Sequence, residues 1–423
     1  MRRMKDSGIE YVGEIPEAWE IHPLYCYFCE RKNRNYALQE RNLLSLSYGN
    51  VVRKDIDTVG GLLPTSFNTY NIVEKGDIII RPTDLQNDKR SLRTGLVKEK
   101  GIITSAYIDL KPLSGINSAY YRYLLHAYDT MKVFYNMGNG VRQGLNYDEF
   151  SKLTVFQPDA SEQERIVDYL DEKCNEIDSL VEDIQSEIEI LEGYKQSLIV
   201  EAVTKGLNKN TDMKESGVAW CPVIPSHWKV INPKALFKQR FDRASFGERQ
   251  LTASQEYGIV FQDEYMEMTG NRVVTVLKDF SILKHVEPGD FVISMRSFQG
   301  GLEYSEVRGC ISSAYVMLIP NKELVYPRFY KWFFKSSKYI NAIQSTSNLV
   351  RDGQAMRYAN FIQVPLFLIP LAEQEEISDY LDDKISEINS VLKTKTEQVD
   401  ILSDYKRAMI FEFVTGKKEA PAV

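Results

Sequence analysis

Four polar segments of the sequence carry side chains that could recognise the bases of duplex DNA. They span residues 81–95, 138–144, 294–301 and 347–357. Arg, Gln and Asn can form bidentate hydrogen bonds with guanine and adenine edges in the major groove, whereas Lys and Ser suit phosphate oxygens. The candidate DNA-binding residues are Arg81, Lys89, Arg90, Arg93, Asn139, Arg142, Gln143, Arg296, Ser297, Gln299, Arg351, Gln354 and Arg357.

Each polar segment follows an element that the sequence predicts. Apolar runs with a Gly-Asp turn, "GDIIIR" at 76–81 and "GDFVISM" at 289–295, predict strands that lead into the first and third segments. Aromatic amphipathic stretches at 118–136 and 326–344 predict helices before the second and fourth. Solvated loops often have this composition, so one such segment is a weak signal. The same placement in both halves of the chain strengthens the hypothesis.

The two halves are copies of one unit. "EQERIVDYLDEK" begins at Glu162, and "EQEEISDYLDDK" begins 211 positions later at Glu373. "MKDSGIEYVGEIPEAWEI" from Met4 likewise pairs with "MKESGVAWCPVIPSHWKV" from Met213. A solenoid would show many short repeats, whereas this pattern indicates a tandem duplication of one large unit, joined near residues 204–211. The predicted class is α+β, with two similar mixed α/β domains related by pseudo-twofold symmetry.

Two acidic stretches predict long helices that pair with each other. In the first, Ser161 with Glu164 suits a capping box and Gly206 suits a C-terminal stop. A heptad stripe predicts a helix-helix seam, with Ile166 and Leu180 as companions in the first helix. The seam residues are Leu170, Ile177, Ile184, Leu191 and Leu198 in the first helix and Leu381, Ile388, Leu402 and Met409 in the second, with Lys395 as a polar interruption. The alternative is that each helix packs only on its own globular domain.

These patterns predict five regions in the order domain, helix, domain, helix, tail. The bounds are 1–160, 161–206, 207–370, 371–416 and 417–423. The net charge of −7 resides in the helices, since the helical regions 161–206 and 371–423 carry −9 and −5, while 1–160 and 207–370 carry +2 and +5. Mildly basic domains are compatible with a nucleic-acid partner. The five scattered cysteines predict free thiols, and the absence of a long apolar run or signal peptide predicts a cytoplasmic protein.

Several catalytic functions are disfavoured by the sequence. It contains no P-loop, and "GNGVRQG" at 138–144 lacks the spacing of a dinucleotide-binding loop. A loose nuclease pattern, Pro158-Asp159 followed by Asp171-Glu172-Lys173, falls partly inside the first long helix, where such charges suit a solvated face. Cys26 and Cys29 with nearby His22 lack a fourth ligand for a closed zinc site, so we expect no bound metal.

The sequence resembles the specificity subunit of type I restriction-modification systems. The resemblance rests on the two "EQE" helix starts with "DYLD", the "IPEAWE" and "IPSHWK" openings, the two "SAY" strands and the "EAVTKG" that closes the first helix. It covers essentially the whole chain. In that family two target-recognition domains, each recognising half of an interrupted DNA sequence, are held apart by two long antiparallel helices.

The resemblance implies a non-catalytic chain that recognises a bipartite, asymmetric target in double-stranded DNA. It also implies two DNA adenine methyltransferase subunits bound to the helices and a motor-nuclease subunit that joins them. S-adenosylmethionine, ATP and Mg would then belong to the partner subunits, with no cofactor in this chain. The alternative is a coiled-coil protein-interaction scaffold whose globular domains do not bind DNA.

Overall fold

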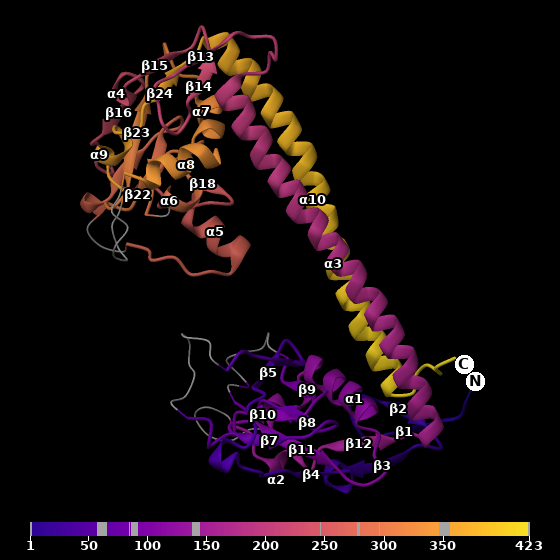
Figure 1. Ribbon diagram of the computed structural model, residues 1–423. Coiled ribbons are helices and arrows are strands. Elements are labelled where there is room, and N and C mark those ends of the chain that lie inside the picture. Colours follow the sequence, from indigo (N-terminus) through magenta and orange to yellow (C-terminus); the bar gives the residue numbers. More distant parts are fainter. Residues whose placement is uncertain are drawn as a thin grey trace. The chain divides into compact units, whose positions relative to one another are not determined.

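The computed structural model describes residues 2–56, 66–83, 85, 92–137, 144–245, 247–276, 280–295, 297–346 and 356–421. The chain folds into two compact units (Figure 1). Unit 1 contains residues 1–185 and 397–423, and unit 2 contains 186–396. Each unit therefore combines one globular domain with segments of both long helices, α3 (Ala160–Lys205) and α10 (Leu371–Val414).

Unit 1 contains a four-stranded antiparallel sheet in the order β4-β11-β8-β9 and four smaller two-stranded sheets, β1-β2, β3-β12, β5-β6 and β7-β10. Its strands are β1 (Met4–Asp6), β2 (Glu14–Pro16), β3 (Glu20–Pro23), β4 (Phe28–Glu30), β5 (Leu44–Ser47), β6 (Asn50–Arg53), β7 (Asn71–Val73), β8 (Ile78–Ile80), β9 (Thr94–Leu96), β10 (Gly101–Ile103), β11 (Ile108–Pro112) and β12 (Thr154–Gln157). Its helices besides the long pair are η1 (Leu24–Cys26), η2 (Tyr36–Leu38), α1 (Ser118–Thr130), η3 (Val133–Asn136) and α2 (Tyr147–Phe150).

Unit 2 repeats this arrangement, with a main sheet in the order β16-β23-β20-β21 and the two-stranded sheets β13-β14, β15-β24, β17-β18 and β19-β22. Its strands are β13 (Met213–Glu215), β14 (Val223–Pro225), β15 (Lys229–Ile231), β16 (Phe237–Arg240), β17 (Leu251–Ser254), β18 (Gly258–Phe261), β19 (Lys284–Val286), β20 (Phe291–Ile293), β21 (Glu303–Tyr304), β22 (Gly309–Ile311), β23 (Val316–Pro320) and β24 (Leu366–Leu368). Its helices are α4 (Pro233–Leu236), α5 (Gln262–Thr269), η4 (Phe280–Ile282), α6 (Ser297–Gly300), α7 (Pro327–Phe333), α8 (Ser337–Gln344) and α9 (Tyr358–Phe361). Each sheet of unit 1 has a counterpart in unit 2, in agreement with the internal repeat.

The first long helix begins one residue before the predicted capping residue. The carboxylate of Asp159 accepts hydrogen bonds from the Glu162 backbone N–H at 2.8 Å and from the Ser161 hydroxyl at 2.7 Å. The cap is therefore Asp159, and the capping role expected for Ser161 was wrong. These hydrogen bonds lower the pKa of Asp159, as expected for a carboxylate at a helix N-terminus. At the other end Gly206 has φ +72° and donates its N–H to Ala202, which confirms the predicted stop.

Both interpretations of the long helices hold in different parts of their length. In unit 1, Ile166 and Leu170 of α3 share one hydrophobic core with Phe413 of α10 and with Ile78 and Tyr120 of the globular domain. In unit 2, the C-terminal part of α3 and the N-terminal part of α10 share a core with the other domain in the same way. The helix ends are thus part of the domain cores, while residues further along pair with the other long helix.

Candidate nucleic-acid interface

Described residues next to or within the predicted DNA-binding segments contact each other in each unit. In unit 1 the N–H of Leu145, directly after segment 138–144, donates to the carbonyl of Pro82 in segment 81–95 at 3.0 Å. In unit 2 the side-chain amide of Gln344, just before segment 347–357, donates to the carbonyl of Phe298 in segment 294–301. Described residues at the edges of segments some 50 residues apart in sequence are thus close together in each unit.

Two of the predicted DNA-binding residues are buried and support the fold instead. Arg93 is 0% exposed, and its guanidinium donates to the Tyr135 hydroxyl at 3.0 Å and to the carbonyl of Thr83. Ser297 is also 0% exposed, and its hydroxyl accepts a hydrogen bond from the Ser294 N–H at 2.9 Å. Side chains that water does not reach cannot contact DNA in this conformation. The DNA-binding role expected for Arg93 and Ser297 was therefore wrong.

Three other predicted residues lie at the surface of the described structure. Gln299 and Arg357 are exposed, and Arg81 is half-buried just after β8. The remaining predicted residues lie outside the described residues: Lys89, Arg90, Asn139, Arg142, Gln143, Arg296, Arg351 and Gln354. Their assignment stays a prediction.

Each unit also presents a β-hairpin that the sequence-based search for DNA-binding residues missed. In unit 1, Tyr48 lies at the turn between β5 and β6, 86% exposed and with φ +45°. The adjacent Gly49 also has positive φ, and two consecutive residues of this kind suit a hairpin turn between right-twisted strands. In unit 2, Tyr257 lies at the turn between β17 and β18 and is 41% exposed. The sequence "LSLSYGNVVR" carried this signal, since a Gly-Asn turn separates two short apolar runs.

The strand that leads into the first segment of each unit is anchored by a partly buried ion pair. In unit 1 the guanidinium of Arg31 lies 2.8 Å from the carboxylate of Asp77, just before β8. In unit 2 Arg240 lies 2.7 Å from Asp290, just before β20. Both carboxylates are nearly inaccessible to water, and burial makes the loss of either partner costly. This equivalent anchor fixes where each strand ends and its polar segment begins.

The repeated Glu-Gln dipeptide attaches each domain to a long helix. The indole N–H of Trp19 donates to the Glu162 carboxylate at 2.8 Å, and that of Trp228 donates to Glu373 at 3.0 Å. Both indoles are buried. Each carboxylate also contacts a basic side chain. Arg2 bonds Glu162, and the imidazole of His227 lies 2.7 Å from Glu373.

The glutamine side chain of each dipeptide forms hydrogen bonds with the backbone just before the helix. The side-chain amide of Gln163 donates to the carbonyl of Pro158 at 2.9 Å, and that of Gln374 donates to Ile369 at 2.8 Å. Gln374 also accepts from the Tyr326 N–H at 2.8 Å and donates to Leu324 at 2.9 Å. The motif found twice in the sequence is thus a fixed joint between each domain and its helix.

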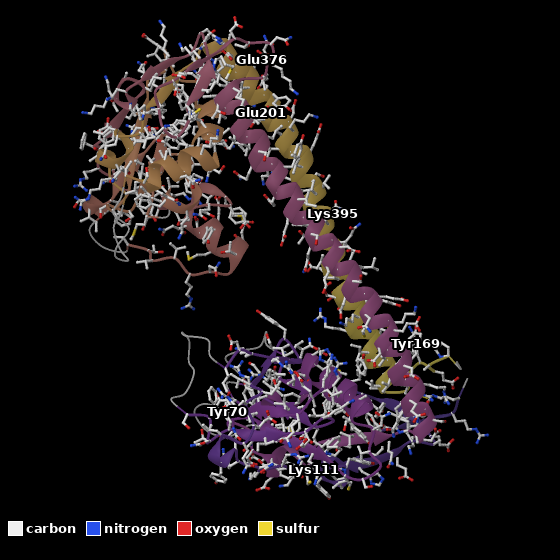
Figure 2. All side chains as sticks on the ribbon, viewed as in Figure 1. Tyr70, Lys111, Tyr169, Glu201, Glu376 and Lys395 are labelled. Carbon is white, nitrogen blue, oxygen red and sulfur yellow. The ribbon has the colours of Figure 1, made fainter. Side chains whose placement is uncertain are left out.

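The long helices run antiparallel where they meet in unit 1. The ring of Tyr169 (Figure 2) lies 4.6 Å from that of Phe413, and nine residues further along α3 Asp178 accepts from Lys406 at 2.6 Å. In unit 2 the polar interruption of the heptad stripe, Lys395, forms an ion pair with Glu187 of the other helix (Figure 2). Antiparallel pairing and ion pairs across the seam are typical of a two-stranded coiled coil.

The predicted seam residues lie at different depths. Five of them are buried: Leu170, Ile177, Leu381, Ile388 and Met409. Those that are half-buried are Ile184, Leu191, Leu198 and Leu402. Leu180, expected as a companion in the seam, is 52% exposed, so that expectation was wrong. The stripe is therefore tightest near the domains.

Exposed apolar side chains recur at equivalent places on the two helices. On α3, Ile190 and Tyr194 are 70% and 55% exposed, and on α10, Ile401 and Tyr405 are 66% and 56% exposed. Residues four apart lie on one face of a helix, so each Ile-Tyr pair forms a single apolar patch. Ile190 and Tyr194 belong to unit 2, and Ile401 and Tyr405 to unit 1. Isolated exposed apolar residues are common, but the same pair on both long helices is typical of an interaction surface.

No helix among the described residues is long and apolar enough to cross a membrane. Within the same residues no cluster of His, Cys, Asp and Glu has the arrangement of a metal site. The Asp171 of the loose nuclease pattern accepts the Tyr123 hydroxyl at 2.6 Å, while Lys173 lies 2.8 Å from Glu176 on the surface of α3. Asp171 thus links α3 to α1, and Lys173 forms an ion pair on the surface of α3.

Comparisons with known proteins cover nearly the whole chain. No protein-family model matches it. It is 21% identical over 426 residues to the MjaX specificity subunit of a type I restriction enzyme from Methanocaldococcus jannaschii, spanning 96% of this chain and 95% of that protein. It is 20% identical to the MjaVIII specificity subunit of the same organism, spanning 95% and 93%.

A solved chain from a study of complex assembly and conformational transition in a type I restriction-modification system has the same fold. It superimposes with a TM-score of 0.65 and 13% identity, over 96% of this chain and 99% of that one. The predicted resemblance to the specificity subunits of type I restriction enzymes is confirmed over at least 95% of the chain.

Proposed function

We propose that this chain is the DNA-recognition subunit of a type I restriction-modification complex. The observation that carries the proposal is the similarity to specificity subunits over at least 95% of the chain, together with the shared fold. We propose that the two domains are target-recognition domains produced by tandem duplication and related by pseudo-twofold symmetry. The equivalent sheets, ion pairs and Trp-Glu joints of the two units support this relationship.

In this proposal each domain recognises one half of an interrupted target in double-stranded DNA. The hydrogen bonds between residues at the edges of the paired polar segments support it, as does the exposure of Gln299 and Arg357 in unit 2. The segments differ in sequence between the units, so the two half-sites differ and the target is asymmetric. Helices of 46 and 44 residues would set the spacing between the half-sites, because helices fixed at both ends to domains are stiff.

We propose that the paired helices hold the catalytic subunits and that this chain performs no reaction itself. Two equivalent Ile-Tyr patches support two copies of one partner, a DNA adenine methyltransferase, with a motor-nuclease joining the complex. S-adenosylmethionine, ATP and Mg would bind those subunits. Since its partner is chromosomal DNA, the chain would act in the cytoplasm.

Sequencing of methylated DNA tests target recognition. Cells that carry the chain and its methyltransferase should methylate an interrupted motif, and cells without the chain should not. Insertion of one heptad at equivalent places in α3 and α10 should change the gap between the half-sites while their bases stay the same. A methylated motif that does not depend on the chain, or half-site bases that change with the insertion, would refute the proposal.

Duplex binding separates this function from that of a protein-interaction scaffold without DNA binding. Recognition of DNA releases counterions from phosphates, so the affinity of the assembled complex for its target should fall steeply as salt increases. A scaffold would show no duplex binding at any salt concentration.

The stoichiometry of assembly tests the partner surfaces. Tyr194→Lys should abolish one methyltransferase site and Tyr405→Lys the other, because a lysine placed in an apolar contact must lose its hydration. The matched control is Gln196→Lys, an exposed position two residues from Tyr194 and so on another face of α3. Native mass spectrometry should find two partners on the control, one on each single variant and none on the double variant. Two partners on the double variant would place the interface elsewhere.

A further inference from the structure

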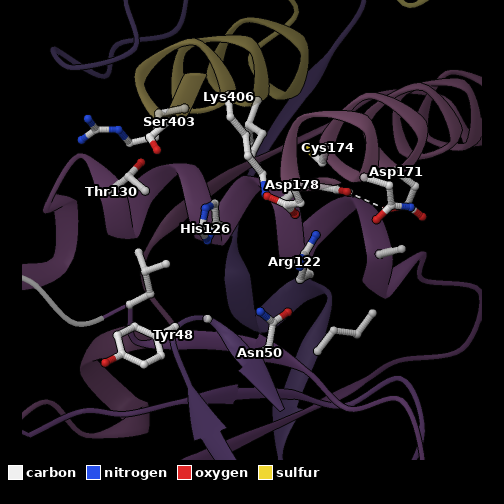
Figure 3. A pocket seen from close by; sticks show the side chains of 18 of the residues that line it. Tyr48, Asn50, Arg122, His126, Thr130, Asp171, Cys174, Asp178, Ser403 and Lys406 are labelled. Atoms are coloured by element: carbon white, nitrogen blue, oxygen red, sulfur yellow. Dashed lines mark hydrogen bonds and ion pairs between the residues drawn. The ribbon is translucent and has the colours of Figure 1, made fainter. Parts of the chain in front are cut away.

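Unit 1 encloses a pocket between α1, the two long helices and the turn of the β5–β6 hairpin (Figure 3). Its volume is about 490 Å³, within the range of pockets that bind small molecules. Leu92 of the predicted DNA-binding segment 81–95 contributes to its lining, while most of the lining comes from α1, the two long helices and the hairpin turn. Neither the repeat nor the resemblance pointed to this pocket.

The wall formed by α1 and α10 is rich in cationic groups. Arg122 and His126 lie one turn apart on α1, and Lys406 faces them from α10 (Figure 3). The guanidinium of Arg122 lies 4.4 Å from the centre of the Tyr123 ring and, among the described residues, forms no ion pair with a carboxylate. Lys98 and Arg407 also line the pocket.

The carboxylates of the pocket are already engaged. Asp171 accepts the Tyr123 hydroxyl at 2.6 Å, and Asp178 accepts the Lys406 ammonium at 2.6 Å. Of the four cations that line the pocket, Lys406 is paired with Asp178 and Arg407 with Asp404. The excess of positive charge therefore comes from Arg122 and Lys98. An anion placed there would find donors available at Arg122 without breaking either of these contacts.

The pKa of His126 is affected by the same positive charges. Burial lowers its pKa to about 3, and the positive charges of Arg122, Lys406 and Lys132 act in the same direction. His126 is therefore neutral at physiological pH, with one ring nitrogen available as a donor and the other as an acceptor. A neutral donor one helical turn from the Arg122 guanidinium is a suitable lining for an anionic oxygen.

In unit 2, two cations in and just after α7 are paired with carboxylates of the same unit, while Lys331, at the place of Arg122, lies over the Trp332 ring. Lys335, which follows α7 at the place of His126, donates to Glu303 at 2.5 Å. Arg328 of α7 forms ion pairs with Asp379 and Asp382 of α10.

The remaining wall is apolar. Leu92, Leu96 and Ile410 line it, and the exposed ring of Tyr48 stands at its rim. A ligand that fits both walls combines an anion with a flat apolar group. We propose that this pocket binds a nucleoside monophosphate, with its phosphate at Arg122 and its base between Tyr48 and the apolar wall. This inference is independent of DNA recognition.

Histidine NMR of the full chain tests the proposal with AMP as the probe. The sequence contains four histidines, so the ring signals of His126 can be assigned with the His126→Gln variant. AMP should shift the His126 signals and leave those of His22 and His227 unchanged. Inorganic phosphate should bind more weakly than AMP because it lacks the base, and adenosine should not bind because it lacks the charge.

Variants distinguish this pocket from a general attraction of anions. Arg122→Ala should weaken AMP binding about tenfold, the loss expected for one charge-assisted hydrogen bond. Lys331→Ala, at the equivalent position of α7, should have no effect. Arg122→Met keeps the apolar stem over Tyr123 and serves as a second variant if alanine destabilises the fold. Unshifted His126 signals at millimolar AMP, equal binding of AMP and phosphate, a shift caused only by duplex DNA, or unchanged binding by both Arg122 variants would overturn the proposal.

Discussion

Removal of the Glu373 carboxylate should loosen unit 2 from its helix. In Glu373→Ala the indole N–H of Trp228, now 3.0 Å from the carboxylate, loses its acceptor. Trp228 is 0% exposed, so water cannot replace the lost partner without a local rearrangement. A charge-assisted hydrogen bond contributes about 1.5 to 3 kcal/mol, and a donor left buried incurs a similar penalty. The bond of His227 to the same carboxylate is exposed and adds little.

We therefore expect the free energy of unfolding of unit 2 to fall by about 2 kcal/mol in Glu373→Ala. Glu373→Gln should recover part of this loss, because the amide oxygen still accepts from the indole. The control is Glu375→Ala, which removes an exposed carboxylate two residues further along α10. Urea unfolding followed by tryptophan fluorescence is suitable, since three of the four tryptophans, including Trp228, lie in unit 2.

The equivalent substitution in unit 1 provides a second measurement. Glu162→Ala should destabilise unit 1, which contains a single tryptophan, Trp19, bonded to that carboxylate at 2.8 Å. The two losses should add in the double variant, because the joints share no partner. The reasoning is refuted if Glu373→Ala and Glu375→Ala differ by less than about 0.5 kcal/mol, the size of ordinary surface substitutions.

Other predictions concern two titratable groups and one surface residue. Burial, with a neighbouring carboxylate, raises the pKa of Asp109 above 3.8, so unit 1 should lose stability as pH rises above that value. In urea unfolding at neutral pH, Asp109→Asn should therefore be more stable than the unchanged protein. Burial lowers the pKa of His285, but hydrogen bonds to Glu287 and Glu248 outweigh it and the pKa is raised above 6.5. The contribution of His285 to the stability of unit 2 should be complete below pH 6.5 and should disappear as pH rises through the higher pKa of the folded state. Unfolding curves of His285→Gln should lack this pH dependence. Arg357→Ala should weaken recognition of one half-site by about 1 to 3 kcal/mol without loss of assembly, and methylation at unchanged rates and sequences would exclude a base contact.

The sequence identified the repeated unit, the long helices and the end of the first helix because these features depend on local spacing. A heptad stripe and the glycine at 206 act within a few residues. The exact start of α3 was missed by one residue, because Asp159 and Ser161 are both capping types and local sequence does not distinguish them. Leu180 was misplaced for a related reason, since a stripe alone does not say where a partner helix ends its contact.

The candidate DNA-binding residues could be predicted by type but not by accessibility. Arg93 and Gln299 are both polar residues in segments that follow a central strand. Arg93 turns inward because Tyr135 and Thr83 supply acceptors there, and Tyr135 is brought close only by the packing of η3 on the sheet. The hairpin tyrosines Tyr48 and Tyr257 were missed because aromatic residues are usually buried.

The sequence by itself determined that the chain is a doubled unit with two acidic, heptad-striped helices, since composition and periodicity are written along the chain. Only the tertiary structure decided what the repeated Glu-Gln dipeptide does. Its carboxylates meet Trp19 and Trp228, which precede them by more than 140 residues, and hydrogen bonds between such distant groups depend on how whole domains pack against helices. The same packing paired Arg328 and Lys335 of unit 2 with carboxylates but left Arg122 facing a pocket without a carboxylate partner among the described residues.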